Sequence, residues 1–563
     1  MFSAYFPITS SFFVEVVLFF LLPCFLLLPL VLNSGNLAFV TAAIQKKIFF
    51  LVLRAAQLIL LLFLFVDCFH FGQTLTSELH STILLHTGNF FFRHDLFIWF
   101  VNIFLTALTL HYLYLVAFVF SKTTKTVTYI AEIPFLVLCT LLCLRLFIAT
   151  NDLILMVILL EIAAFCSLIY IGIQSVSSNQ YSLSIEATLK YFIINAVAVA
   201  LLLLAISGYF YLTTSTNLID IVTHFYKYPF TCVFFTEQLI FVQVVFFFAY
   251  LIKLGAAPLH QWVPDVYEGA ETLVTCFLVL IISPALMFKF IMFFKLLTAV
   301  PGSILFVKTV MLVTGTLSIV FGTLGAFYQT RIKRFIAYAG LTHLGFMLLG
   351  LCFNSVLSYF AFLFYLVIYV ITNVCFFTFF VFCQQQATQQ ARVIFMNQLK
   401  IPIQTSFFLF FCLVTCLFSF AGIPPFAGFF AKFFILSVLV QQQYFLILVL
   451  LIIAILIGTF MYLRFLKICL FETTALLNKQ PWAVTLNSSF FSLPKTLVAV
   501  FADFTISLKS QNVVYKVTTL NAWHAWLLSV LIWLLGFLFL FLFLFSIYSL
   551  GIFELVLVLL TVY

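Results

Sequence analysis

Long apolar runs, almost free of charge, are the feature that most limits what this chain can fold into. The stretches 12–32 and 526–550 each hold 20 or more nearly uncharged residues, enough for a helix to cross about 30 Å of hydrocarbon. Of the 563 residues, 66% are hydrophobic and 7% are charged, so water could not wet the surface of a soluble fold. The sequence therefore predicts an all-α polytopic membrane protein and excludes a soluble one.

Hydropathy along the chain predicts about fourteen membrane-spanning helices. The expected spans are 11–32, 48–66, 96–119, 131–149, 153–173, 187–211, 237–257, 271–294, 304–327, 335–352, 356–382, 406–440, 443–463 and 525–549. The twelfth span has 35 residues, too many for one straight crossing, and it contains Pro424 and Pro425. We therefore expect two half-helices joined by a break. The seventh span ends in a similar way at Pro258, two residues before His260.

The basic residues provide a check on this span count, because loops on the cytoplasmic or matrix side of membrane proteins carry an excess of Lys and Arg. With fourteen spans, fifteen loop Lys and Arg residues fall on one face and three on the other. The three are Arg93, Lys227 and Lys295. Miscounting one span would mix the two sets, so the pattern favours fourteen spans with both chain ends on the positive-poor face.

The two predicted breaks suggest internal symmetry. Lys253 precedes its break, whereas Lys432 follows its break. Spans seven and twelve are five apart and so run in opposite directions, as in the inverted repeats of ion transporters. The predicted organisation is an N-terminal three-helix segment at 1–130, a first five-helix repeat (helices 4–8) at 131–300, a second repeat (helices 9–13) at 301–464, a matrix-side loop at 465–524, and helix 14 with the tail at 525–563.

No motif for a redox centre or a nucleotide occurs in the sequence. The 13 Cys residues include no C-x-x-C pair, and there is no G-x-G-x-x-G, P-loop or C-x-x-C-H motif. The basic residues behind the net charge of +9 are scattered over span ends and form no stripe suited to nucleic acid. We therefore expect no cofactor, no metal and no nucleic-acid partner for this chain, and any electron chemistry on another chain.

Ionisable residues near the middle of a span are the candidate functional groups. Each costs at least about 2.5–3.5 kcal/mol in hydrocarbon, so such residues usually face a hydrated interior and mark an ion or proton path. By depth, Glu161, Lys253, Lys289 and Lys432 qualify, in spans five, seven, eight and twelve. A membrane carboxylate beside a buried Lys can exchange a proton with it when a partner charge moves. These four residues are the predicted core of a proton path.

Other charged residues lie closer to span ends, where simpler interpretations apply. Lys190 lies one turn after Glu186, so an i,i+4 ion pair or a side chain that snorkels to the membrane surface would explain it. Lys308, Arg54 and Arg145 are interpreted as snorkelling flanks.

The stretch 251–270 reads LIKLGAAPLHQWVPDVYEGA and resembles the seventh-helix break of the antiporter-like membrane subunits of respiratory complex I. Further matches to that family follow in the same order along the chain. They are Glu161 in LLEIAAFCSL, EATLKYF at 186–192, YQTRIKRFIAYAGLTHLGFMLLGL at 328–351, AGIPPFAGFFAKF at 421–433 and YLRFLK at 462–467. The resemblance covers roughly residues 150–470, and fourteen helices agree with the full-length family.

This resemblance implies that the chain is one of three homologous pump-like modules in the membrane arm of a complex that passes electrons from NADH to ubiquinone and pumps protons. The family's proton-path positions are matched by Glu161, Lys190, Lys253, His343 and Lys432. Without the resemblance, His343 would be interpreted as a hydrogen-bonded core histidine.

The same resemblance implies partners and a location. FMN, iron–sulfur clusters and ubiquinone are expected on other subunits. The expected partners are other membrane-arm subunits, including homologous antiporter-like chains, and lipids such as cardiolipin. The 80 Phe residues suggest a T-rich coding sequence, as in organellar genomes. We therefore expect a multi-pass protein of the mitochondrial inner membrane, with both termini on the intermembrane-space side.

One position departs from the family pattern. The family usually carries a Lys in the eighth span, which would fall at Ser283 or, with one insertion, at Ala285. We hypothesise that Lys289, one turn beyond Ala285, substitutes for it. Two other functions stay open, namely a cation/proton antiporter subunit and a structural spacer whose proton path has lapsed.

Overall fold

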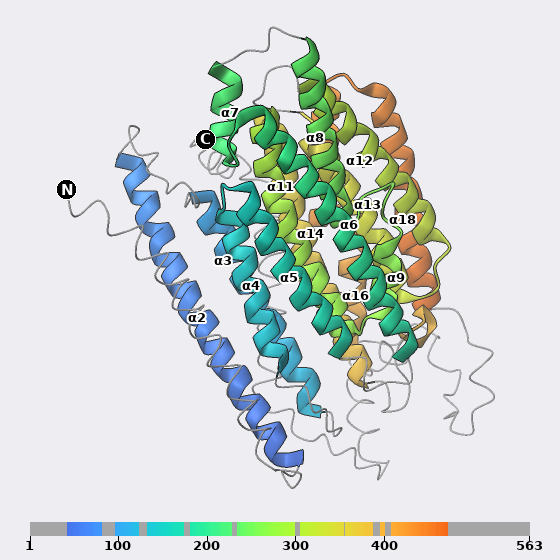
Figure 1. Ribbon diagram of the computed structural model, residues 1–563. Coiled ribbons are helices and arrows are strands. Elements are labelled where there is room, and N and C mark those ends of the chain that lie inside the picture. The colour runs from blue at the N-terminus through green and yellow to red at the C-terminus, as the bar shows by residue number, and fades with distance from the viewer. Residues whose placement is uncertain are drawn as a thin grey trace, which may run out of the picture. The chain divides into compact units, whose positions relative to one another are not determined.

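The computed structural model of the chain describes residues 42–80, 96–122, 132–173, 181–227, 233–298, 304–353, 355–386, 394–399 and 407–470. Eleven helices in these ranges are long and apolar enough to cross a membrane, and they run side by side (Figure 1). In chain order the elements are α2 (Ala42–His80), α3 (Leu96–Lys122), α4 (Glu132–Ala149), α5 (Leu153–Ile173), α6 (Tyr181–Thr213), α7 (Leu218–Lys227), α8 (Val233–Leu254), α9 (Trp262–Gly269), α10 (Thr272–Phe277), the π-helical turn η3 (Leu278–Ile282), α11 (Ser283–Thr298), α12 (Ile304–Phe327), α13 (Ile332–Leu351), α14 (Val356–Gln386), the 3-10 turn η4 (Met396–Leu399), α16 (Phe407–Ala421), α17 (Ala427–Gln441) and α18 (Phe445–Leu470).

Helices occupy every predicted span that lies in the described ranges. The eighth span consists of α10, η3 and α11, and the twelfth of α16 and α17. The short helix α7, between α6 and α8, was not predicted. The prediction of an all-α polytopic membrane protein is thus confirmed, and no β-strand occurs in the described ranges. The predicted spans 11–32 and 525–549 lie outside the described residues, so the total of fourteen and the division into inverted repeats stay predictions.

The chain leaves helical geometry in the same way at two places. Gly255 follows the end of α8 and Gly422 follows the end of α16, with φ angles of +73° and +76°. These left-handed angles suit glycine because it has no Cβ atom. The backbone N–H groups of Ala256 and Ile423 each return to the carbonyl oxygen five residues earlier, at 3.0 and 3.2 Å. Both helices therefore stop in the same capped turn.

The residues predicted from the sequence to interrupt spans seven and twelve lie in the connections after these turns. Pro258 and His260 lie between α8 and α9, and Pro424 and Pro425 lie between α16 and α17. The ring of His260 stacks on that of Phe321 of α12, with 5.6 Å between the centroids. Because a proline has no backbone N–H to donate, none of these three prolines can contribute to a helical hydrogen-bond ladder.

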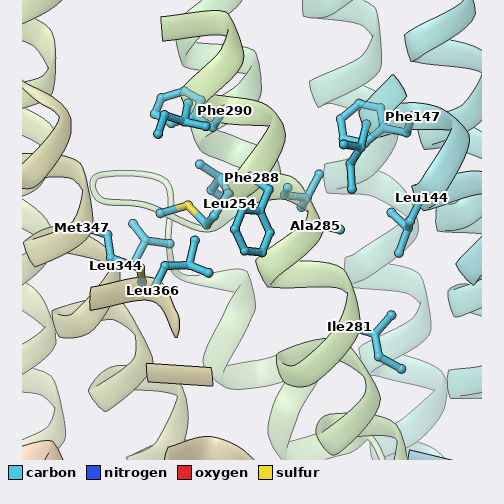
Figure 2. Close-up of a cluster of buried hydrophobic side chains, with 14 of the residues drawn as sticks. Leu144, Phe147, Leu254, Ile281, Ala285, Phe288, Phe290, Leu344, Met347 and Leu366 are labelled. Atoms are coloured by element: carbon cyan, nitrogen blue, oxygen red, sulfur yellow. The ribbon is translucent and has the colours of Figure 1, made fainter. Parts of the chain in front are cut away.

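The eighth span is the most enclosed of the described spans. Of its most apolar stretch, 83% of the residues are buried, compared with 28% for α6 and for α18. Its second half, α11, contacts α3, α4, α8, α12 and α14. Figure 2 shows Ala285 and Phe288 with Leu144 on one side and Leu344 on the other. The eighth span therefore lies inside the bundle, whereas α6 and α18 present broad apolar faces outward.

A buried ion pair ties α2 to α4. Arg145 donates two hydrogen bonds to the Asp67 carboxylate, at 2.7 and 2.8 Å, and the two side chains are 2% and 1% exposed. The guanidinium also lies over the ring of Phe63, 5.3 Å from its centroid. The interpretation of Arg145 as a snorkelling flank is therefore wrong, because its charge is neutralised inside the bundle.

The variant Arg145→Met would leave the Asp67 carboxylate buried without its cation, and we expect a loss of about 3–5 kcal/mol of stability. The double variant Asp67→Leu/Arg145→Met removes both charges, so we expect its stability to be close to that of the unchanged protein. Thermal denaturation of the detergent-solubilised protein in its assembled state measures both. Equal losses in the single and double variants would contradict the prediction.

Candidate functional site

A carboxylate, an amide and an ammonium group meet between three helices. Glu161 of α5 accepts a hydrogen bond from Asn195 of α6 at 3.0 Å, and the Lys253 ammonium of α8 lies 3.5 Å from the same Oε1 atom. The side chain of Lys253 is 6% exposed and that of Glu161 is 23% exposed. Bonds between an ammonium and a carboxylate are usually about 2.7–2.9 Å long, so this pair is a loose one. The structure thus brings two predicted path residues together and adds Asn195 to them.

Trp262 adds a second donor at the end of α8, where the backbone N–H of Gly255 already donates to the Ile252 carbonyl at 3.1 Å. Helix α8 ends one residue after Lys253, and the last carbonyl groups of a helix lack helical partners. The indole Nε1 of Trp262 donates a hydrogen bond to the Ile252 carbonyl at 3.2 Å. A carbonyl at the end of α8 is thus satisfied without the lysine.

Lys432, the predicted path residue of the second break, binds differently. Its ammonium donates to the carbonyl groups of Phe420 and Ala421, at 2.9 and 2.7 Å. These are the last two residues of α16, so the lysine of α17 caps a helix that ends inside the bundle. Its Nζ atom also lies 5.7 Å from the ring centroid of Phe346. Lys432 is therefore both a buried charge and a structural cap.

His343 of α13 lies between two tyrosines. Its Nδ1 atom is 2.8 Å from the hydroxyl of Tyr365 of α14, and its Nε2 atom is 3.0 Å from the hydroxyl of Tyr462 of α18. The imidazole ring also packs on Phe420, with 5.2 Å between the centroids. Phe420 therefore contacts both residues: its ring packs on His343, and its carbonyl accepts a hydrogen bond from Lys432. A neutral imidazole can donate to one hydroxyl and accept from the other, so the ring is fully hydrogen-bonded.

Lys190 of α6 is bound by two carboxylates. Its ammonium lies 2.7 Å from Glu186, four residues earlier, and 2.6 Å from Asp265 of α9. The i,i+4 pair predicted from the sequence is therefore confirmed. The Lys190 side chain is 38% exposed, and ion pairs at this exposure contribute little to stability.

Lys289 of α11 binds the end of α4. Its ammonium donates to the carbonyl groups of Ile148 and Thr150, at 3.0 and 2.5 Å, and it is 2% exposed. Its Nζ atom also lies 5.3 Å from the ring centroid of Phe293. The side chain thus avoids lipid and serves as a helix cap, and its substitution for the family lysine stays a prediction.

Two cavities meet at Ser283. The larger, of about 80 Å³, is lined by Lys253, and the smaller, of about 50 Å³, is lined by Leu344, the neighbour of His343 on α13. Ser283 lines both, whereas Ala285 is fully buried and outside both linings. The π-helical turn η3 ends at the residue before Ser283, and such turns recur at functional sites. Of the two positions at which the family lysine is expected, Ser283 thus lies between the two cavities and Ala285 does not.

Several groups that hold the site together were not predicted. The amide of Asn195 and the hydroxyls of Tyr365 and Tyr462 gave no signal in the sequence, because single Asn residues are common in helices and the chain has 23 Tyr. Asp265 and Glu268 were visible in the stretch 251–270, but their partners were not. Spacing along the chain does not reveal which helix a side chain will face.

A comparison with protein-family models matches residues 150–458 to the family described as NADH:quinone oxidoreductase/Mrp antiporter, transmembrane. The match covers more than half of the chain. The chain belongs to this family. The matched range contains both helix breaks and every predicted path residue.

Curated relatives in this family are subunits of NADH-oxidising enzymes. NADH-ubiquinone oxidoreductase chain 2 of Rhizopus oryzae is 32% identical over 355 residues, which are 62% of this chain and 65% of the relative. NADH-quinone oxidoreductase subunit N of Pelagibacter ubique is 30% identical over 364 residues, 63% of this chain and 73% of the relative. The chain thus spans slightly less than two thirds of the first relative's length.

Chains of solved structures share the fold. A chain of respiratory complex I from Thermus thermophilus aligns with a TM-score of 0.55 at 20% identity, over 77% of this chain and 89% of that chain. A chain of the Mrp complex from Dietzia sp. aligns with a TM-score of 0.63 at 19% identity, over 80% of each chain. A chain of an archaeal membrane-bound sulfane sulfur reductase reaches 0.69 at 17% identity, over 96% of each chain. At these identities the likeness establishes the fold alone.

The variant Lys432→Met would leave the Phe420 and Ala421 carbonyl groups without their donor, and we expect a loss of about 1–3 kcal/mol for each. Lys467→Met is the matched control, because Lys467 is an exposed lysine near the end of α18. The thermal midpoint of the assembled protein should fall in the first variant and stay unchanged in the second. Equal midpoints would show that the cap contributes nothing to stability.

Proposed function

We propose that this chain is the membrane subunit of a proton-pumping NADH:quinone oxidoreductase that corresponds to subunit N of the bacterial enzymes and to chain 2 of the mitochondrial one. The names of the relatives support this proposal. In it the chain carries no redox centre. FMN, iron–sulfur clusters and ubiquinone bind to other subunits, and this chain moves protons while quinone is reduced elsewhere.

The loose Glu161–Lys253 pair is the observation that carries the proposal. The two groups lie 3.5 Å apart, and a cavity of about 80 Å³ adjoins the lysine. A water molecule needs roughly 10–15 Å³ of such space, so several can fit. Each charge stabilises the other, so a small displacement of one partner changes which group holds the proton. The pair is therefore suited to pass a proton between Glu161, the cavity and Lys253.

The rest of the proposed path follows the predicted residues. Lys190 lies at the α9 end of α6, and we assign it the entry to the Glu161–Lys253 pair. The second cavity is lined by Leu344, the neighbour of His343, and Phe420 packs on His343 through its ring and accepts from Lys432 through its carbonyl. Water in the two cavities would bridge the position at which the family usually has a lysine.

The proposed partners are the other membrane-arm subunits of the complex, including homologous antiporter-like chains, with cardiolipin among the surrounding lipids. The proposed location is the mitochondrial inner membrane, with both termini on the intermembrane-space side. The 80 Phe residues support an organellar gene. The outward apolar faces of α6 and α18 are suitable surfaces for neighbouring subunits or lipid.

The likeness to an Mrp complex favours one alternative, a cation/proton antiporter subunit. Blue-native separation of the membranes distinguishes the two. In the proposed function the chain comigrates with NADH dehydrogenase activity. Migration away from that activity would support the antiporter.

Lys253→Met is the variant that tests the proton path. We expect fewer protons to be moved per NADH oxidised, because a positioned acid or base is lost and proton transfer at this position slows by about 100-fold or more. The measurement is the number of protons moved per NADH oxidised by membrane vesicles that contain the assembled complex. Lys467→Met should leave it unchanged. An unchanged proton yield in Lys253→Met, with assembly intact, would instead favour a structural spacer.

Ser283→Leu tests the water bridge between the two cavities. The leucine side chain would fill the wall that both cavities share, and we expect a lower proton yield per NADH oxidised. Ser283→Ala removes the hydroxyl but leaves room for water, so we expect a smaller loss. If Ser283→Leu assembles and pumps normally, protons do not pass between these cavities.

A further inference from the structure

The short helix α9 carries two carboxylates that bind basic residues of two different helices. Asp265 Oδ2 lies 2.6 Å from the Lys190 ammonium of α6, and its Oδ1 lies 3.3 Å from the Arg334 guanidinium of α13. Glu268, one turn later on α9, contacts both Arg334 and Arg331. Helix α9 is thus an ionic bridge between α6 and α13.

Six charged side chains form these ion pairs. They are Glu186, Asp265, Glu268, Lys190, Arg331 and Arg334. If Lys190 loses its proton, the carboxylates that bind it lose the attraction of that positive charge. The acidic side chain shared between Lys190 and Arg334 is that of Asp265. A change in the charge of Lys190 therefore acts on Arg334 through one carboxylate.

A second contact fixes α9 to α13. Lys333, next to Arg334, donates to the carbonyl group of Ala270, the residue that follows α9. His343 lies nine residues after Arg334 on the same helix, about 13 Å along the axis at 1.5 Å per residue. Helix α13 thus connects the Arg334 ion pairs directly to the histidine.

We propose that Asp265 is a positioning residue that couples the protonation of Lys190 to the placement of α13, and this inference rests on the proton-path function proposed above. While Lys190 is charged, Asp265 divides its two oxygens between Lys190 and Arg334. When the proton leaves Lys190 for the next acceptor, the carboxylate stays ionised and binds Arg334 alone. When Lys190 is protonated again, Glu186 on the same helix is a second carboxylate that can bind its ammonium.

This arrangement is better suited to coupling than to stability. The side chains of Lys190, Asp265 and Arg334 are 35–38% exposed, and pairs at such exposure add little stability. They connect α6, which carries Lys190, to α13, which carries His343. Through Asp265, the charge of Lys190 therefore affects the position of α13, and the position of α13 affects Lys190.

The test is Asp265→Asn in the assembled complex, with the rate of NADH-driven proton uptake as the readout. We expect proton movement through this chain to slow by about 2- to 30-fold, the range for loss of a coupling contact, and the measured rate to fall with it. Asp265→Glu should restore part of the rate, because it returns the charge. The matched control is Asp220→Asn, since Asp220 is an exposed carboxylate of α7, and it should pump normally.

The double variant Lys190→Met/Asp265→Asn separates coupling from a general defect. If Asp265 acts through Lys190, the double variant pumps about as well as Lys190→Met alone. Multiplied losses would overturn the inference, as would normal pumping in Asp265→Asn. If Asp265→Asn does not assemble, Arg334→Gln breaks the same link from α13, and normal pumping there overturns it too.

The result for Lys253→Met distinguishes failure of the proton-path proposal from failure of the Asp265 proposal. Normal pumping in Lys253→Met would contradict the proton-path function. Impaired pumping in Lys253→Met together with normal pumping in Asp265→Asn removes only the coupling role of Asp265.

Discussion

A helix that ends inside an apolar bundle leaves carbonyl oxygens without helical partners, and the structure depends on how these are satisfied. At the end of α16 the Lys432 ammonium is a donor, and at the end of α8 the Trp262 indole joins the backbone N–H of Gly255 on the Ile252 carbonyl. Lys289 serves the end of α4 and Lys333 the end of α9. Buried cations and interrupted helices therefore stabilise each other, which lets an apolar bundle hold both.

The donors that satisfy the helix-end carbonyl groups differ between the two breaks, and this difference affects what the two lysines can do. At the first break the Ile252 carbonyl is bound by Gly255 and Trp262, and the Lys253 ammonium pairs loosely with Glu161. Lys432 has to cap α16, so a change in its charge also changes the helix end that it holds. At the first break an acid and a base thus lie beside a cavity, whereas at the second break the charged side chain of Lys432 also holds the end of α16. Between them lies the wall at Ser283.

Much of the fold could be predicted because hydrophobic runs report directly on membrane-spanning length. The mid-span positions of Glu161, Lys253 and Lys432 were predicted for a related reason, since a charge in an apolar run needs an explanation. The pair Asp67–Arg145 was missed because both residues lie near span ends, where lipid-surface contact was the simpler interpretation. Nothing in spacing alone showed that they are at most 2% exposed and face each other.

The sequence by itself determined the class of fold, and it predicted two helix breaks and a set of ionisable residues that could carry protons. It could do so because membrane-spanning length, glycine and proline geometry, and the cost of charge in hydrocarbon are local properties. Only the tertiary structure decided which charge meets which partner. Asn195 with Glu161, Asp265 between Lys190 and Arg334, and Lys432 on α16 depend on the helix faces that packing brings together, and those contacts join residues far apart in the chain.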